Sequence, residues 1–243
     1  MRLYIIRHAQ SVNNMLANQA DRVADPYLTD LGFRQAEIVA RHLARGIDPE
    51  YIIGVSEEDT AADSRQRYKI DHLYCSAMHR ALLTARPIGH ALGLTPRIWL
   101  DIHEHGGIYL DHGGDRGVVA YPGLDRAAIL RDFPDYHLPS TITDEGWWKP
   151  EWGREDWPGC QGRAIRVVRE LRERAALREN IALVTHGGFI DALIKALTSQ
   201  LPGIHLFYHH YNTAITRIDF RPGGEVDIRY LNRFDHLPPE LIS

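Results

Sequence analysis

The 243-residue chain contains only two cysteines, Cys75 and Cys160. Two cysteines in a chain of this length are too few for a disulfide framework, and no CxxC pair is present to bind zinc. Sparse cysteine is typical of proteins from a reducing compartment, so we expect a cytoplasmic location.

Long hydrophobic runs and an excess of basic residues are also missing. No apolar run approaches the roughly 20 residues that span a membrane, and the run after Met1 is too short for the apolar core of a signal peptide. The net charge is -4 with histidine neutral, whereas nucleic-acid binders usually carry a basic surplus. We therefore expect no membrane and no nucleic-acid partner. The sequence carries no signal for an oligomeric state.

Apolar segments with strand character alternate with segments of helical period. Strands are expected at 3–6, 72–76, 97–100, 181–185, 214–220 and 226–231, and helices at 29–45, 79–92, 161–178 and 189–201. In the first helix, we expect Phe33, Ala36, Ala40 and Leu43 to share one face, and Gly93 is expected to cap the second. The alternation predicts one α/β domain spanning 1–243, a three-layer α/β/α sandwich around a mostly parallel sheet.

Two stretches lack a clear period. Residues 47–69 are polar and are expected to form mostly surface loop. Residues 105–160 carry glycines, prolines and four of the five tryptophans, and we interpret them as a cap inserted over the core. The tryptophans at 147, 148, 152 and 157 would form the core of this cap or wall a substrate site.

Histidines follow two of the expected strands. The first strand runs into Arg7 and His8, and the strand at 181–185 runs into His186 and Gly187. In parallel sheets, ligands bind beyond the carboxyl ends of the strands, so both imidazoles are expected at one edge. The glycine backbone after His186 opens a helix, which favours an anion close to Gly187.

Arginine and glutamate complete the expected phosphoryl pocket. Arg7 and Arg80 follow strand ends, and the guanidinium group matches phosphate oxygens in a fork. Two such cations can supply the charge that Mg²⁺ supplies elsewhere, so no metal and no cofactor is expected. A neutral imidazole can act as nucleophile toward phosphorus, and Glu104 is the candidate general acid and base.

Four segments resemble the ordered motifs of the histidine phosphatase superfamily, in its phosphoglycerate-mutase-like branch. They are residues 7–14 (RHAQSVNN), 28–36 (LTDLGFRQA), 76–85 (SAMHRALLTA) and 185–188 (THGG). The resemblance covers the core and omits the loop at 47–69 and the cap. It implies that His8 is phosphorylated, that Arg7, Arg80 and His186 bind the phosphoryl group, and that Asn14 lines the pocket.

The chain departs from the family pattern at two places. Ala9 replaces the usual glycine, and the segment at 103–105 reads HEH rather than the ERHYG run associated with the mutases. The second departure favours hydrolysis of a small-molecule phosphomonoester over mutase activity. A cofactor-dependent mutase and a non-catalytic phospho-ligand-binding protein remain alternatives on the same fold.

Simpler or different roles remain open for several residues. Ser11 and Asn14 are also typical helix-capping residues. A metallohydrolase using His103, His105 and His112 is a further alternative, although their spacing fits no metal motif.

The expected cap is acidic, with five Lys or Arg residues against ten Asp or Glu residues at 105–160. Such a surface should repel highly anionic substrates. We therefore expect a phosphomonoester whose remainder is neutral, apolar or cationic.

Overall fold

The computed structural model describes residues 1–48, 67–201, 203 and 205–243. Its main sheet has the strand order β3-β2-β6-β1-β7-β8. Strands β1, β6, β2 and β3 pair in parallel, whereas β7 and β8 are antiparallel. The strands are Arg2–Arg7 (β1), His72–Cys75 (β2), Arg97–Ile98 (β3), Asn180–Thr185 (β6), Ile215–Phe220 (β7) and Val226–Arg233 (β8). The predicted mostly parallel α/β fold is confirmed.

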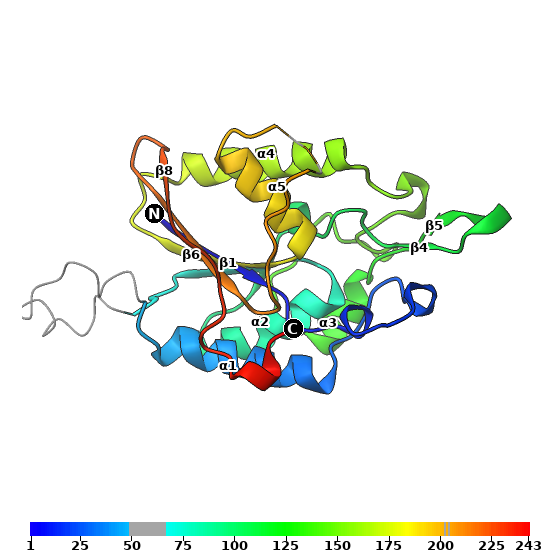
Figure 1. Ribbon diagram of the computed structural model, residues 1–243, viewed down its shortest axis with the longest axis horizontal. Helices are drawn as coiled ribbons and strands as arrows, with labels where there is room; N and C mark the ends of the chain where they lie inside the picture. Colours follow the sequence, from blue (N-terminus) through cyan, green and yellow to red (C-terminus); the bar gives the residue numbers. More distant parts are fainter. Residues whose placement is uncertain (49–66, 202, 204) are drawn as a thin grey trace, which may run out of the picture.

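Two helix layers cover the sheet (Figure 1). Helices α1 (Asp30–Arg45) and α2 (His79–Leu92) pack together on one face, and α4 (Trp157–Glu173) and α5 (Gly187–Leu197) pack together on the other. Alternate side chains of β1 enter opposite cores: Tyr4 and Ile6 join the α1–α2 side, and Leu3 and Ile5 the α4–α5 side. This alternation follows from the two-residue period of a strand, and it produces the three predicted layers.

Local sequence signals set the ends of the first two helices. The hydroxyl of Thr29 accepts the Gly32 N–H at 3.0 Å and begins α1. Gly93 ends α2 in the left-handed conformation at φ 66°, as predicted. The predicted apolar face of α1 is wrong at Phe33, which is 38 % exposed. It packs beside Tyr27 instead, with ring centroids 5.6 Å apart.

Several predicted boundaries shift by a few residues. Helix α4 begins at Trp157 rather than residue 161, because the Asp156 carboxylate accepts the Gly159 N–H and Pro158 occupies the first turn. Helix α5 begins at Gly187 and ends at Leu197, not at 189 and 201. Strand β3 is only two residues long and leads into a 3₁₀ turn at Leu100–Ile102. Most of the predicted loop at 47–69 lies outside the described residues.

The region predicted as a cap contains regular elements of its own. Strands β4 (Tyr109–Asp111) and β5 (Val118–Ala120) form an antiparallel arm that projects from the body of the molecule (Figure 1). Helix α3 (Arg126–Asp132) follows. Further 3₁₀ turns lie at Val12–Asn14, Gln19–Asp21, Gly114–Arg116, Pro150–Trp152 and Pro239–Leu241. Among the described residues, no helix has both the length and the apolar character to span a membrane.

Candidate active site

The pairing of β1 with β6 brings the two predicted histidines together. Arg7 and Thr185 are partners in the parallel register, so the next residues, His8 and His186, leave the sheet at the same edge. Their ring centroids lie 5.0 Å apart, and both side chains are buried. The predicted juxtaposition of these two imidazoles is present in the structure.

Hydrogen bonds hold His8 in one neutral tautomer. Its Nδ1 lies 2.7 Å from the Ala9 carbonyl oxygen, which can only accept a hydrogen bond. Its Nε2 lies 3.1 Å from Nε of Arg80, which can only donate one. The proton is therefore on Nδ1, and the Nε2 lone pair faces Arg80. Burial, followed by the charges of Arg80 and Arg7, holds the pKa of His8 well below its ordinary value, which keeps the imidazole neutral.

Both ring nitrogens of His186 lack a hydrogen-bond partner among the described residues, although the side chain is fully buried. Burial lowers the pKa of His186 well below its ordinary value, and the charge of Arg80 adds to this effect. Buried polar atoms in folded proteins are usually satisfied, so an unsatisfied pair indicates a role outside packing.

Arg80 is the second residue of α2 and is almost buried. Its Nη1 lies 3.8 Å from Oδ1 of Asp25, whose carboxylate also accepts the His79 N–H at the start of α2. Burial raises the pKa of Asp25 to about 6, and the charge of Arg80 opposes that rise. Sequence reasoning missed Asp25. Its carboxylate contacts both the first N–H group of α2 and the Arg80 guanidinium.

Arg7 is the last residue of β1 and directly precedes His8. Its Nη1 donates to the His210 carbonyl oxygen, and its Nε has no hydrogen-bond partner among the described residues. A Cβ placed on Gly187 would lie 3.5 Å from this Nε, in ordinary contact. The guanidinium therefore runs along the backbone that opens α5.

Glu104 occupies the anion site predicted at the start of α5. Its Oε1 accepts the N–H groups of His105 at 2.9 Å and Phe189 at 3.0 Å, and its Oε2 accepts the Gly188 N–H at 3.3 Å. The partial positive charge of the helix terminus therefore acts on Glu104 itself. The Glu104 carboxylate can lie this close to the start of α5 because Gly188 has no side chain, since a Cβ on Gly188 would be 2.7 Å from Glu104 Oε1. The predicted Gly187 matters less for this contact.

The structure gives Asn14 a capping contact rather than a place on the cavity wall. Its Oδ1 accepts the N–H and the hydroxyl of Ser11, each at 3.0 Å, and its side chain is exposed. The neighbouring Asn13 lines the cavity instead. Asn13 also donates to the Val23 carbonyl oxygen and accepts the Val23 N–H, which fixes the segment next to Arg22. Sequence reasoning did not single out Asn13.

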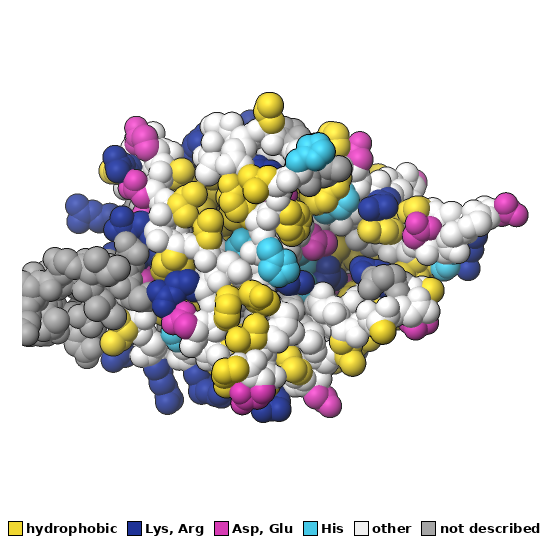
Figure 2. Space-filling view, viewed as in Figure 1, with side chains coloured by type: hydrophobic (Ala, Val, Ile, Leu, Met, Phe, Trp, Pro, Cys, Tyr) yellow, Lys and Arg dark blue, Asp and Glu magenta, His cyan; other side chains and the backbone are white. Residues whose placement is uncertain are grey.

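A cavity of about 260 Å³ is lined by Arg80 and Glu104, whereas His8, His186 and Arg7 are not among its lining residues. Trp157 stacks on His105 with ring centroids 3.9 Å apart, and this pair forms part of the wall. Trp147 and Trp148 are instead buried in the core, whereas Trp152 is 56 % exposed. Figure 2 shows acidic, basic and histidine side chains close together in the hollow beside the β4–β5 arm. The lining residues are Asn13, Arg22, Ala24, Pro26, Arg80, Glu104, His105, Gly107, Tyr109, Trp157, Gly188 and Phe207.

The three histidines considered as metal ligands have different neighbours. His103 is buried against Trp147 and Trp148, and His105 stacks on Trp157. His112 contacts the Tyr121 hydroxyl at 2.8 Å on the surface. Within the described part of the chain, no three side chains of the ligand-forming types His, Cys, Asp and Glu are grouped to hold a metal ion.

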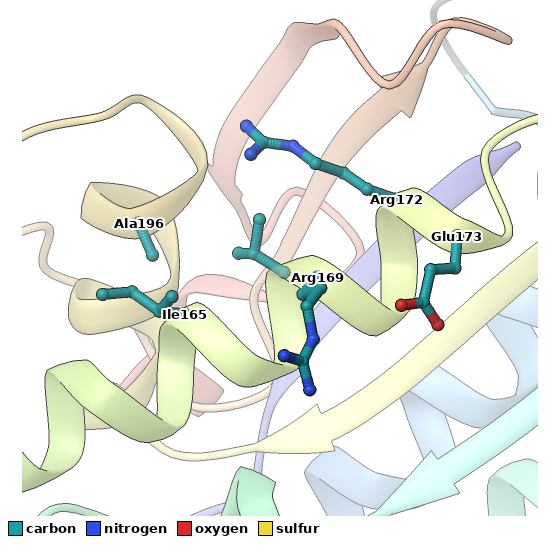
Figure 3. A pocket seen from close by; sticks show the side chains of 6 residues that line it. Ile165, Arg169, Arg172, Glu173 and Ala196 are labelled. Carbon is teal, nitrogen blue, oxygen red and sulfur yellow. The ribbon is translucent and has the colours of Figure 1, made fainter.

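A separate cavity of about 380 Å³ lies between α4 and α5. Figure 3 shows Ile165, Arg169, Arg172 and Glu173 projecting from α4 and Ala196 from α5 around it. None of the predicted site residues lines this cavity.

Comparison with known proteins identifies a matching family. A family model of the histidine phosphatase superfamily (branch 1) matches residues 3–58 and 53–233. No curated protein sequence matches the chain.

Solved structures share the fold. Mycobacterial glucosyl-3-phosphoglycerate phosphatase with VO₃ is 22 % identical with a TM-score of 0.55, covering 96 % of this chain and 99 % of that one. Phosphoserine phosphatase from Entamoeba histolytica, in a mutant form with phosphoserine, is 19 % identical with a TM-score of 0.58, covering 98 % and 99 %. The same phosphatase with 3-phosphoglyceric acid is 18 % identical with a TM-score of 0.59, again covering 98 % and 99 %.

Proposed function

The chain belongs to the histidine phosphatase superfamily, branch 1, and on that premise we propose that it hydrolyses phosphomonoesters through a phosphohistidine on His8, without a metal ion. The observation that carries the proposal is the tautomer of His8. Its Nδ1–H is held by the Ala9 carbonyl, and its Nε2 lone pair faces Arg80 at 3.1 Å. A buried, neutral imidazole with a directed lone pair beside a guanidinium is suited to attack phosphorus.

The first step transfers the phosphoryl group to His8. The Nε2 lone pair forms a bond to phosphorus while the bond from phosphorus to the ester oxygen breaks. Glu104 gives a proton to the leaving oxygen, and the alcohol departs. The Ala9 carbonyl, 2.7 Å from Nδ1, stabilises the positive charge that the ring acquires.

The second step releases phosphate. Glu104, now a carboxylate, takes a proton from water, and the water oxygen bonds to phosphorus as the bond to Nε2 breaks. The electron pair returns to His8 and Glu104 is protonated again. Gly188 and Phe189 hold the Glu104 carboxylate through backbone N–H groups, so one residue can serve both steps without moving.

Charge on the transferred oxygens is neutralised by side chains. In the proposed complex, Arg80 donates to the phosphoryl oxygens instead of to Nε2 of His8, and Arg7 and His186 donate to the remaining oxygens. Support comes from the buried Nε of Arg7 and the two buried ring nitrogens of His186, for which the described part of the chain offers no hydrogen-bond partner. The His186 ring lies 5.0 Å from that of His8. Arginines in a water-poor pocket provide the stabilisation that a metal ion gives in other phosphoryl-transfer sites.

The test is hydrolysis of phenyl phosphate in the presence of EDTA by the wild-type protein and by His8→Ala. Turnover that resists EDTA and is lost in His8→Ala supports the proposal, and acid-quench trapping of ³²P on the wild-type chain identifies the intermediate. Turnover that survives His8→Ala but is abolished by EDTA refutes it. A wild-type protein that hydrolyses no ester but exchanges phosphoryl groups between phosphoglycerates would be a mutase, and one that only binds phosphate would be a binding protein.

A further inference from the structure

Arg163 of α4 and Glu155, which lies just before that helix, form a buried ion pair that the proposed reaction does not use. The guanidinium meets the carboxylate in a fork, since Nε donates to Oε1 at 2.8 Å and Nη2 donates to Oε2 at 2.6 Å. The two side chains are only 4 % and 12 % exposed. Burying two charges carries a desolvation cost, and apolar residues of similar volume often stabilise a fold at least as well. The pair is therefore a candidate for a role beyond stability.

The remaining nitrogen of the Arg163 guanidinium holds the segment that leads to Glu104. Nη1 donates to the Asp101 carbonyl oxygen at 2.6 Å and to the His103 carbonyl oxygen at 2.9 Å. These carbonyl groups need donors, because the two-residue strand β3 ends before them and the chain continues through the 3₁₀ turn at Leu100–Ile102. A side chain thus fixes the backbone on the N-terminal side of Glu104.

Glu155 holds the same segment on the other side of Glu104. Its backbone N–H donates to the Gly106 carbonyl oxygen at 3.2 Å. The Arg163 guanidinium also lies over the Phe189 ring, 4.8 Å from its centre. The Phe189 N–H is one of the groups that hold the Glu104 carboxylate. The ion pair therefore contacts the chain before Glu104, the chain after it and the residue that anchors its side chain.

We propose that Arg163 and Glu155 are positioning residues that set the Glu104 carboxyl group for proton transfer to the leaving oxygen. This inference rests on the proposed function, in which Glu104 donates that proton. Neither member of the pair lines the cavity that contains Arg80 and Glu104, so the pair acts on the reaction through the position of Glu104. Loosening the pair should weaken proton donation and leave attack by His8 intact.

The experiment compares two esters that differ in their need for a proton. Phenyl phosphate releases a weakly acidic phenol, whereas 2,4-dinitrophenyl phosphate releases a stable anion that departs without protonation. In Arg163→Lys and in Glu155→Gln, we expect kcat/KM for phenyl phosphate to fall roughly tenfold or more, and that for 2,4-dinitrophenyl phosphate to change by less than about twofold. Glu104→Gln should show the same selective loss, and adding Arg163→Lys to it should not change the ratio of the two values further.

Arg166→Met is the matched control. Arg166 lies on the same helix and pairs with the Asp101 side chain, but its own side chain is 52 % exposed. Loss of an exposed pair should have little effect on the position of the backbone. The ratio of the two kcat/KM values should therefore stay at the wild-type value in this variant.

The outcomes separate this inference from the proposed function. Equal losses for the two esters, which a general loss of structure would also produce, overturn the inference, as do unchanged values for both, while His8-dependent hydrolysis by the wild type stands. If the wild type hydrolyses neither ester, the proposed function fails, and amide hydrogen exchange decides the positioning role. Exchange of the Phe189 N–H should be roughly tenfold faster in Arg163→Lys, and that of Leu193 in the middle of α5 should be unchanged. Unchanged exchange at Phe189, or an equal increase at both positions, would refute it.

Discussion

Gly188 lies so close to Glu104 that a Cβ added at Gly188 would be 2.7 Å from Oε1 of the carboxylate. The same added atom would be 3.3 Å from the Cβ of His105. Side-chain atoms essentially never approach this closely, so a larger residue at 188 must displace Glu104 from the N–H groups that hold it. The absence of a side chain at 188 therefore positions the proposed acid and base.

Gly188→Ala is expected to lower kcat by about 10²-fold, since the loss of a positioned proton donor typically has that effect. The melting temperature should change little, because Glu104 can swing into the cavity. Gly187→Ala serves for comparison, as its added Cβ meets Arg7 only at 3.5 Å, and it should lose less activity. Steady-state kinetics on phenyl phosphate measure both. Equal losses in the two variants would contradict the steric argument.

Arg80→Lys should reduce kcat/KM by about 10²-fold although the charge is kept, because a lysine cannot present a planar fork to phosphoryl oxygens. The matched control is Arg86→Lys on the same helix. Arg86 packs on Phe133 and donates to the Asp132 carbonyl oxygen, away from the cavity. Kinetics on phenyl phosphate should show wild-type turnover in the control. Near-normal activity in Arg80→Lys would mean that Arg80 acts only as a distant charge.

The pH dependence of kcat/KM should reflect the lowered pKa of His8. Burial is the main cause and the charge of Arg80 the next. Protonation of His8 removes the attacking lone pair. The acid limb of the kcat/KM profile should therefore lie well below pH 6.5 in the wild type. Arg80→Met removes the repelling charge and should shift that limb toward higher pH, whereas Arg80→Lys should not. Profiles corrected for substrate ionisation test this, and an unmoved limb in Arg80→Met would refute it.

The parallel fold was predictable because short apolar runs with clear ends alternate with helical segments. The misplaced starts of α4 and α5 arise from residues that a periodicity argument ignores. Pro158 is accepted at the first turn of a helix, and Gly187 gives no helical signal although it opens α5. Regular elements at 109–132 were also missed, since β4, β5 and α3 are too short to display a period.

The site was predictable where it depends on strand ends. Parallel pairing of β1 and β6 necessarily places His8 beside His186. Asp25 was not predictable in its role, because it meets Arg80 through tertiary packing across many residues of sequence. The substrate preference drawn from the composition of residues 105–160 stays a prediction, since net charge contains no information about which acids are already paired.

Lys195→Met should destabilise the protein by about 3–5 kcal/mol, the usual consequence of breaking a buried ion pair. Lys195 and Asp191 are both nearly fully buried and 2.7 Å apart. Lys195 also donates to the Gly203 and Leu206 carbonyl oxygens and so holds the segment that carries Phe207 to the cavity.

Urea unfolding measures the stability of Lys195→Met. The exposed pair of Arg131 and Asp132 is the control, and Arg131→Met should leave stability unchanged. A KM for phenyl phosphate that rises in Lys195→Met would link the ion pair to the cavity wall. Stability equal to that of the wild type would show that the segment reorganises at no cost.

Stability should decrease on acidification below about pH 6.5 because several histidines are buried in the neutral form. Burial lowers the pKa of His210 and of His236 to about 4, and lowers those of His8, His103 and His186 well below the ordinary value. An unfolded chain binds protons at these positions below about pH 6.5 while the folded chain does not. Each histidine should therefore contribute a slope of about 1.4 kcal/mol per pH unit between its folded and unfolded pKa values.

Asp25 acts in the opposite direction over part of this range. Its pKa of about 6 in the folded protein exceeds its ordinary value of 3.8, so it favours the folded state at low pH and loses that contribution as pH rises through 6. One acid against five histidines leaves a net loss of stability on acidification. Urea unfolding from pH 7.5 to 4.5 should show this loss, and His236→Gln should show a shallower slope. A stability independent of pH over this range would mean that the buried histidines become protonated in the folded protein.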